Sequence, residues 1–229
     1  MLLPFVVSSL IGGKVMKYEA VIFDLDGTLL DTLEDLRSSV NHALRTFGLP
    51  ERSLEEIRSF VGNGVRNLML KAVPGGADEP RFEEIFAEFK RWYAVHWREV
   101  TCPYEGVVEL VQELHRRGLK LAVVSNKSDA EVKKLCEEFF GGLLHSVRGE
   151  VAGVPRKPAP DSILLTLESL GVSREQALYV GDSEVDARTA RNAQVALAAV
   201  TWGFRSREEL SAEGATVFVD SPAELLELV

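Results

Sequence analysis

Cysteine and histidine are scarce in this chain of 229 residues, and basic residues are not in excess. Cys102 and Cys136 lie far apart and the four histidines are scattered, so neither type shows the spacing of a zinc site or a disulfide framework. Lysine and arginine number 26 against 35 aspartates and glutamates, and the resulting net charge of −9 disfavours binding to a nucleic-acid backbone. We therefore expect a cytoplasmic protein with reduced thiols and no nucleic-acid partner.

Long apolar runs are also missing. The first 16 residues, MLLPFVVSSLIGGKVM, form an apolar stretch that is too short to span a bilayer. The stretch lacks the basic segment and the small-residue cleavage site of a secretion signal. We therefore expect no membrane partner, and we interpret residues 1–16 as an N-terminal extension that is dispensable for function.

Short apolar runs, by contrast, recur along the chain and alternate with segments of helical periodicity from Tyr18 onward. The predicted strands are 20–24, 120–125, 145–150, 177–182, 195–200 and 216–219. The predicted helices are 105–116, 129–139, 159–170, 184–192, 206–212 and 222–228. This alternation is typical of parallel strands joined by helices, so the sequence predicts an α/β fold with a doubly wound, Rossmann-like parallel sheet.

Residues 33–99 interrupt the alternation. No strand pattern is present there, and apolar residues recur at spacings of three and four, as in Leu33, Leu36, Val40 and Leu44. We therefore predict a helical domain at 33–99, inserted into an α/β core made of residues 17–32 and 100–229.

The segment VIFDLDGTLLDT, residues 21–32, places two aspartates at the end of a predicted buried strand. Because residues two apart on a strand point the same way, Asp24 and Asp26 should share a face while Leu25 faces the core. Two carboxylates about 4 Å apart repel by roughly 4 kcal/mol at the effective dielectric of a protein surface. Such a pair needs a cation to keep it together.

Polar residues also follow other predicted strands, and the carboxyl ends of parallel strands meet where ligands bind. The residues at these ends are Asp24, Asp26, Thr28, Ser125, Asn126, Asp182 and Asp186, and Lys157 precedes the helix that leads into the strand 177–182. Four carboxylates on one rim require a cation, and oxygen ligands without histidine or cysteine favour Mg²⁺. The hydroxyl groups, the amide and the lysine suit a phosphate group, so the sequence predicts a site for both.

The order and spacing of these motifs resemble the haloacid dehalogenase-like hydrolase superfamily. The motifs that carry the resemblance are DLDGTLLDT, VSN, KPAP and GDSEVD, and it extends from about Tyr18 to the end of the chain. The helical insertion resembles the cap domain of that superfamily. The segments VGNGVRNLM, AVVSNK, RKPAPD and VTWGF are most similar to those of phosphoglycolate phosphatases. One departure is Gln194, which stands where members usually have glycine.

The resemblance implies a Mg²⁺-dependent phosphomonoester hydrolase with an aspartyl-phosphate intermediate, acting on 2-phosphoglycolate or a similar small phosphorylated metabolite. Asp24 would be the nucleophile, and Asp26 the general acid and then the base. Ser125 and Lys157 would bind the phosphoryl oxygens.

The resemblance also implies a metal site. Asp182 would bind Mg²⁺ together with Asp24 and the main-chain carbonyl of Asp26. Asp186 would lie behind these ligands and support either the metal or Lys157.

Other functions stay open. The alternatives within enzymes are a phosphatase of sugar phosphates, nucleotides or pyrophosphate and a phosphosugar mutase; outside enzymes, the alternative is a phosphate-binding regulatory module. A catalytically inactive relative would normally have lost Asp24, Asp26 or Lys157, and all three are present in this chain. In the insertion, Arg66 is a candidate for binding a substrate carboxylate. The oligomeric state is open.

Overall fold

The computed structural model describes residues 10–11, 14–15 and 17–229. Its strands are β1 (Leu10–Ile11), β2 (Lys14–Val15), β3 (Ala20–Phe23), β4 (Leu30–Asp31), β5 (Cys102–Pro103), β6 (Lys120–Ser128), β7 (Ser146–Glu150), β8 (Ala177–Gly181), β9 (Ala196–Val200) and β10 (Phe218–Val219). Its α-helices are α1 (Leu33–Thr46), α2 (Leu54–Phe60), α3 (Gly64–Ala72), α4 (Phe82–His96), α5 (Val107–Arg116), α6 (Asp129–Phe140), α7 (Asp161–Leu170), α8 (Glu184–Ala193), α9 (Arg207–Ala212) and α10 (Pro222–Leu228). Short 3₁₀ helices lie at Gly76–Asp78 and Arg174–Gln176.

Six strands form one parallel sheet in the order β10-β9-β8-β3-β6-β7. The chain passes from β3 to β6 and β7 on one side, and then returns to β8, β9 and β10 on the other. The strand order therefore reverses between β3 and β8, which is where ligands bind in open α/β sheets. The predicted doubly wound parallel sheet is confirmed.

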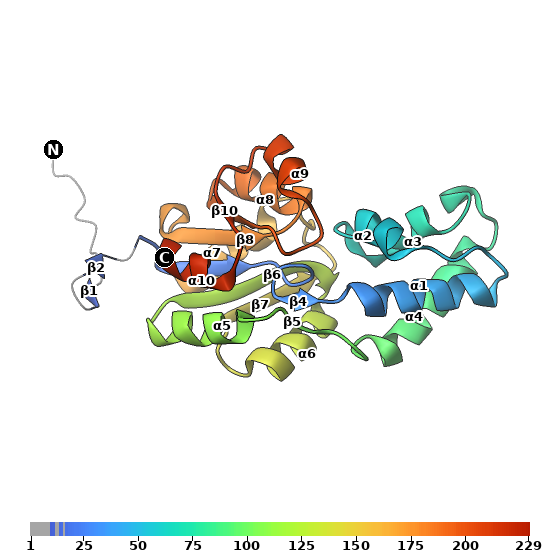
Figure 1. The fold of residues 1–229 in the computed structure, drawn as a ribbon, viewed down its shortest axis with the longest axis horizontal. Coiled ribbons are helices and arrows are strands. Elements are labelled where there is room, and N and C mark those ends of the chain that lie inside the picture. The colour runs from blue at the N-terminus through green and yellow to red at the C-terminus, as the bar shows by residue number, and fades with distance from the viewer. Residues whose placement is uncertain (1–9, 12–13, 16) are drawn as a thin grey trace.

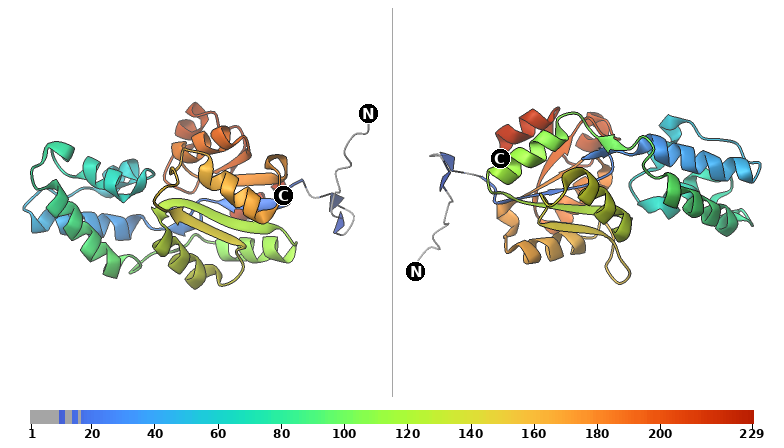
Figure 2. Two further views of the ribbon diagram at one scale, coloured as in Figure 1. Left: turned by 180° about the vertical axis from the view of Figure 1, so that it is seen from behind. Right: turned by 90° about the horizontal axis from the view of Figure 1, so that it is seen from below.

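Helices cover both faces of the sheet (Figures 1 and 2). Val21 and Phe23 of β3 pack in one hydrophobic cluster with residues of α5, α6 and α10. Ala20 and Ile22, which alternate with them, pack in another cluster with residues of α7 and α8. All four residues of β3 are fully buried, which explains why this strand is an unbroken apolar run in the sequence.

Helices α1 to α4 form a block beside the sheet, with a hydrophobic cluster of their own (Figures 1 and 2). α1 packs along α4, and residues 33–99, all of which the structure describes, contain no strand. An antiparallel pair, β4 with β5, joins the block to the sheet at its two crossings. The sequence did not predict this pair, because each strand has only two residues.

The proposed N-terminal extension, residues 1–16, lies mostly outside the described residues. The structure describes β1 and β2 there as an antiparallel pair. Among the helices that are described, none has the length and apolar character needed to cross a membrane.

Candidate active site

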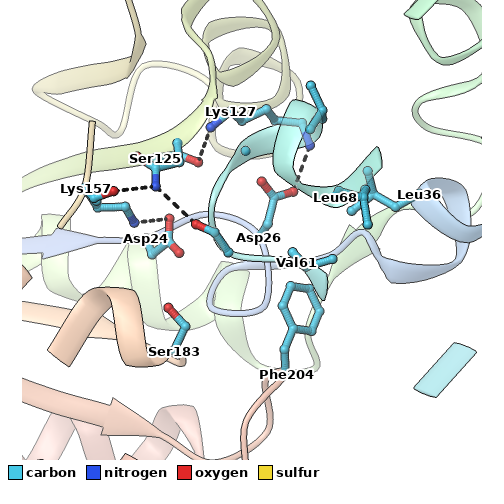
Figure 3. Close-up of a pocket in the computed structure, with 14 residues that line it drawn as sticks. Asp24, Asp26, Leu36, Val61, Leu68, Ser125, Lys127, Lys157, Ser183 and Phe204 are labelled. Atoms are coloured by element: carbon cyan, nitrogen blue, oxygen red, sulfur yellow. Dashed lines mark hydrogen bonds and ion pairs between the residues drawn. The ribbon is translucent and has the colours of Figure 1, made fainter. Parts of the chain in front are cut away.

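The loop after β3 carries two aspartates at the carboxyl end of the sheet. The Asp24 N–H donates to the Val180 carbonyl at 2.9 Å, so Asp24 continues the strand beside β8. Leu25 is fully buried, as predicted. Each aspartate faces its own ammonium group: Nζ of Lys157 lies 2.8 Å from Oδ1 of Asp24, and Nζ of Lys127 lies 2.9 Å from Oδ1 of Asp26 (Figure 3). Two lysines therefore offset the repulsion expected between the aspartates.

Lys157 lies between two carboxylates from different parts of the chain. Its Nζ is 2.8 Å from Oδ1 of Asp186 as well as from Asp24, and it donates to the Tyr179 hydroxyl at 3.0 Å. Burial acts to lower the pKa of Lys157, but Asp186 and Asp24 raise it above its usual value. Lys157 is therefore a fixed positive charge.

Asp186 is the most fully hydrogen-bonded carboxylate of the site. Oδ1 accepts from Lys157 and, at 2.6 Å, from the Tyr179 hydroxyl, while Oδ2 accepts from the N–H and hydroxyl of Ser183. Burial alone would raise the pKa of Asp186, but Lys157 and these hydrogen bonds lower it. Asp186 is thus placed to orient Lys157 and stays ionised.

Asp182 is held in the loop after β8 by two donors. Oδ1 accepts from the Thr28 hydroxyl at 2.9 Å, and Oδ2 accepts from the Phe204 N–H at 2.8 Å. The backbone approaches Asp182 so closely that a Cβ on Gly27 or Gly203 would lie 2.3 Å from it. Gly27 also has a φ of +88°, so any side chain there would be strained as well as blocked.

The buried carboxylates exceed the cations that face them. Asp24, Asp182 and Asp186 each offer an oxygen within 4.8 Å of the others, and all three are buried. Burial and then Asp186 raise the pKa of Asp24 well above its usual value, although Lys157 opposes them. Burial and Asp186 also raise the pKa of Asp182, to about 7. One lysine does not neutralise three carboxylates, so the cluster favours an added cation.

A hard metal ion fits this cluster. The contact between Lys157 and Asp24 is an ion pair without the geometry of a hydrogen bond, and Oδ1 of Asp24 has no hydrogen-bond partner in the described part of the chain. This buried oxygen therefore keeps its acceptor capacity for a further ligand. Carboxylate oxygens without histidine or cysteine are the ligand set of Mg²⁺ or Ca²⁺.

The three predicted phosphate ligands other than Lys157 have different environments. The Ser125 hydroxyl accepts from the Lys127 N–H at 3.2 Å and lines the cavity, so its own proton is available to a ligand. The Thr28 hydroxyl instead donates to Asp182. The Asn126 side-chain amide donates to the carbonyls of Gly62 and Lys157, so it ties the helical block to the sheet.

Lys127 is a buried cation that the sequence reasoning missed. Its side chain is 3% exposed, and its Nζ lies 5.3 Å from the centre of the Tyr93 ring on α4. β6 continues past the predicted strand end at residue 125 and includes Lys127. Residues two apart on an extended strand point the same way, so Ser125 was the signal for Lys127.

The site lies in a cavity of ≈ 50 Å³ that the sheet and the helical block line together. Its floor is polar and its outer wall is apolar (Figure 3). The apolar residues that line it are Leu36, Val61, Val65, Leu68 and Phe204. Arg205, which the sequence reasoning also missed, closes this side: its guanidinium pairs with Glu184 and donates to the carbonyls of Arg58 and Val61, each at 2.8 Å.

The structure does not bring Arg66 into this cavity. Its side chain is half exposed, pairs with Glu83 and lies over the rings of Phe82 and Phe86. Gly64, Val65 and Leu68 of α3 line the cavity, so position 66 lies on another face of the helix.

Comparison with known proteins gives one family. The model of the family described as haloacid dehalogenase-like hydrolase matches residues 21–200. The chain is 34% identical over 212 residues to phosphoglycolate phosphatase 1 of Pseudomonas aeruginosa, covering 90% of this chain and 78% of that protein. It is 32% identical over 222 residues to the N-acetylmuramic acid 6-phosphate phosphatase of the same organism, covering 94% of this chain and 96% of that protein.

The fold is also similar to solved structures. A protein from Lactobacillus delbrueckii subsp. bulgaricus superposes with a TM-score of 0.88 at 38% identity, over 93% of this chain and 98% of that one. The similarity covers the helical block as well as the sheet, since so little of either chain is left out.

Proposed function

This chain belongs to the haloacid dehalogenase-like hydrolase family and is a phosphatase of the phosphoglycolate phosphatase type, and we propose that it hydrolyses small phosphate monoesters through a phosphate bound covalently to Asp24. One observation carries the proposal. Asp24 lies at the floor of a cavity, with a fixed ammonium 2.8 Å from its carboxylate and an oxygen that has no hydrogen-bond partner in the described residues.

Asp24 attacks the phosphorus atom, the bond to the leaving alkoxide breaks, and an acyl phosphate forms on the carboxylate. A carboxylate is a weak nucleophile toward a phosphoryl group that is itself negative. Lys157 reduces this repulsion because its charge lies beside the attacking oxygen. The Ser125 hydroxyl faces the same cavity and donates to a phosphoryl oxygen.

Asp26 acts as the general acid and then as the general base. It gives a proton to the leaving oxygen in the first step, and then takes one from the water that hydrolyses the acyl phosphate. Asp26 suits this role because its carboxylate lines the cavity without joining the cluster around Asp182.

Mg²⁺ is the metal that we propose for this site, with Asp24, Asp182 and the main-chain carbonyl of Asp26 as ligands. When bound, it neutralises charge on the transferring phosphoryl group. Thr28 and the Phe204 N–H keep Asp182 in place, and Asp186 fixes Lys157 from behind.

The helical block at 33–99 is proposed to be a cap domain over a core of residues 17–32 and 100–229. The apolar wall of the cavity comes largely from this block, so closure removes bulk water from the reacting groups. Substrate entry and product release then require the cap to open.

The proposed substrate is 2-phosphoglycolate or a similarly small ester. A cavity of ≈ 50 Å³ suits a short leaving group better than a sugar. The similarity to an N-acetylmuramic acid 6-phosphate phosphatase keeps sugar phosphates as the second candidate class.

The test has two parts. A panel of small phosphate esters, assayed for phosphate release with Mg²⁺, should show hydrolysis with the highest kcat/KM for short esters. Acid quenching during turnover, followed by reduction with borohydride, should then convert the acyl phosphate on Asp24 to an alcohol that mass spectrometry detects. An Asp24 side chain that stays unreduced under turnover conditions would mean that water attacks the substrate directly, and the proposed nucleophile would be wrong.

A further inference from the structure

Two buried ammonium groups line the cavity among the described residues, and only one of them has partners for all three of its N–H groups. Lys157 contacts two carboxylates and the Tyr179 hydroxyl. Lys127 makes one hydrogen bond with its ammonium in the described part of the chain, to Oδ1 of Asp26 at 2.9 Å. An ammonium group has three N–H donors, so Lys127 keeps donor capacity toward the cavity.

The surroundings of Lys127 leave that capacity for a ligand. Its Nζ lies 5.3 Å from the centre of the Tyr93 ring. Burial lowers the pKa of Lys127, while Asp26 and the nearby buried Tyr93 hydroxyl raise it. Tyr93 can take at most one of the three N–H groups, so one is left for a ligand. The outer wall of the cavity is apolar, and among the described residues the cations that line the cavity are Lys127 and Lys157. An anionic group that enters beyond the phosphate therefore meets Lys127.

We propose that Lys127 recognises a carboxylate on the carbon that bears the phosphate ester, so that the enzyme prefers phosphate esters of 2-hydroxycarboxylic acids. This inference rests on the proposed function. As the proton donor, Asp26 lies within about 2.6–3.2 Å of the ester oxygen. Lys127 contacts the same carboxylate. In these esters one carbon separates the ester oxygen from the carboxylate, which brings the carboxylate within reach of Lys127.

The wild-type enzyme tests the preference by chain length. The probes are 2-phosphoglycolate, the one-carbon-longer 3-phosphonooxypropanoate, and 2-hydroxyethyl phosphate, in which a CH₂OH group replaces the carboxylate. A charge-assisted hydrogen bond corresponds to about 10- to 150-fold in kcat/KM. We expect 2-phosphoglycolate to exceed 2-hydroxyethyl phosphate by that factor, with the longer acid between them. Equal kcat/KM values for the three esters would overturn the inference.

Substitution of Lys127 tests the residue. Lys127→Met should lower the ratio of kcat/KM for 2-phosphoglycolate over 2-hydroxyethyl phosphate by about 10- to 150-fold, and Lys127→Arg should keep most of it. Because Lys127 also contacts Asp26, the rates on both esters can fall together, and the ratio isolates the carboxylate. Lys90→Met, an identical change on the exposed side of α4, is the matched control and should leave the ratio and both rates unchanged.

The outcomes are distinct. If Lys127→Met lowers kcat/KM equally for the two esters, Lys127 serves Asp26 alone and the inference is wrong. If Arg66→Met removes the preference while Lys127→Met retains it, the cap arginine recognises the carboxylate instead. If the wild type hydrolyses none of the esters, the proposed function itself fails. Should Lys127→Met not fold, the chain-length series on the wild type decides alone.

Discussion

Replacing Asp182 by asparagine should stabilise the metal-free protein while it abolishes Mg²⁺-dependent activity. The substitution removes one of three buried carboxylates that lie within 4.8 Å of one another. Asparagine can keep both hydrogen bonds of Asp182: its carbonyl accepts from the Phe204 N–H, and its amide donates to the Thr28 hydroxyl oxygen.

The magnitude follows from the charge that is removed. Burial and then Asp186 raise the pKa of Asp182 from 3.8 to about 7. At about 1.4 kcal/mol per pKa unit, the ionised carboxylate costs the fold about 4 kcal/mol above pH 7. The two hydrogen bonds become neutral and weaken by about 1 kcal/mol each. We therefore expect the free energy of unfolding to rise by about 1–3 kcal/mol, or roughly 2–12 °C in Tm for a chain of this length.

The sign of the pH dependence is set by the same group. The pKa of Asp182 in the folded protein, about 7, lies above the usual 3.8, so between these values the folded state binds the extra proton. The metal-free wild type should therefore lose stability as the pH rises from about 4 to about 7, and Asp182→Asn should lack this part of the loss.

Thermal melts in EDTA at pH 5 and pH 8 measure the effect. The gain in Tm should be larger at pH 8, and the exposed Asp78→Asn change should leave Tm nearly unchanged at both. Mg²⁺ at 100 times its Kd should then stabilise the wild type by about 2.7 kcal/mol and the variant much less. A variant that is less stable than the wild type at pH 8, or one that Mg²⁺ stabilises as strongly, would refute the reasoning.

Four further predictions use the same site and its surroundings. Phosphate release from an aryl phosphate should vanish with EDTA and return with Mg²⁺, while Ca²⁺ should restore it poorly because its coordination is looser; full activity after chelation would contradict the metal site. Asp24→Asn should abolish turnover, and Asp26→Asn should lower kcat by about 10²–10⁴-fold; steady-state kinetics with a melt as the folding control measure both, and an active Asp24→Asn enzyme would exclude the covalent route. Arg66→Ala should leave kcat/KM for 2-phosphoglycolate within about 2-fold of the wild type, because the guanidinium pairs with Glu83 outside the cavity; a loss of 10-fold or more would show that the cap moves Arg66 inward. Gln194→Gly should raise the free energy of unfolding by about 1 kcal/mol, because Gln194 has a φ of +58°; an unchanged denaturation midpoint would mean that Gln194 stabilises the fold in another way.

The sequence was sufficient for the sheet and for most of its helices. Buried parallel strands are unbroken apolar runs, so β3 and β8 were recognised within one residue of their bounds. Helix α7, predicted at 159–170, lies between Pro160 and a left-handed Gly171, which are typical residues for the start and the end of a helix. β4 and β5 could not be predicted, since two residues carry no periodicity and their pairing spans the whole helical block.

The convergence of Asp24, Ser125, Lys157 and Asp182 was also accessible from the sequence. Parallel strands bring their carboxyl ends to one edge, so residues that end different strands meet without any knowledge of side-chain positions. Lys127 was missed because the predicted strand ended at residue 125, whereas β6 continues through Lys127 to Ser128.

Only the tertiary structure decided which hydrogen-bond or ion-pair partner each polar side chain has. Thr28 and Asn126 have the chemistry to bind phosphate, yet the first donates to Asp182 and the second to Gly62, a residue of the helical block. Arg66 has the charge to bind a substrate carboxylate, but its position on α3 places it beside Glu83, with which it forms an ion pair. The sequence by itself determined which chemical groups are present and which strand ends carry them. Which donor meets which acceptor depends on the packing of elements far apart in the chain, since a hydrogen bond requires its two atoms within about 3 Å.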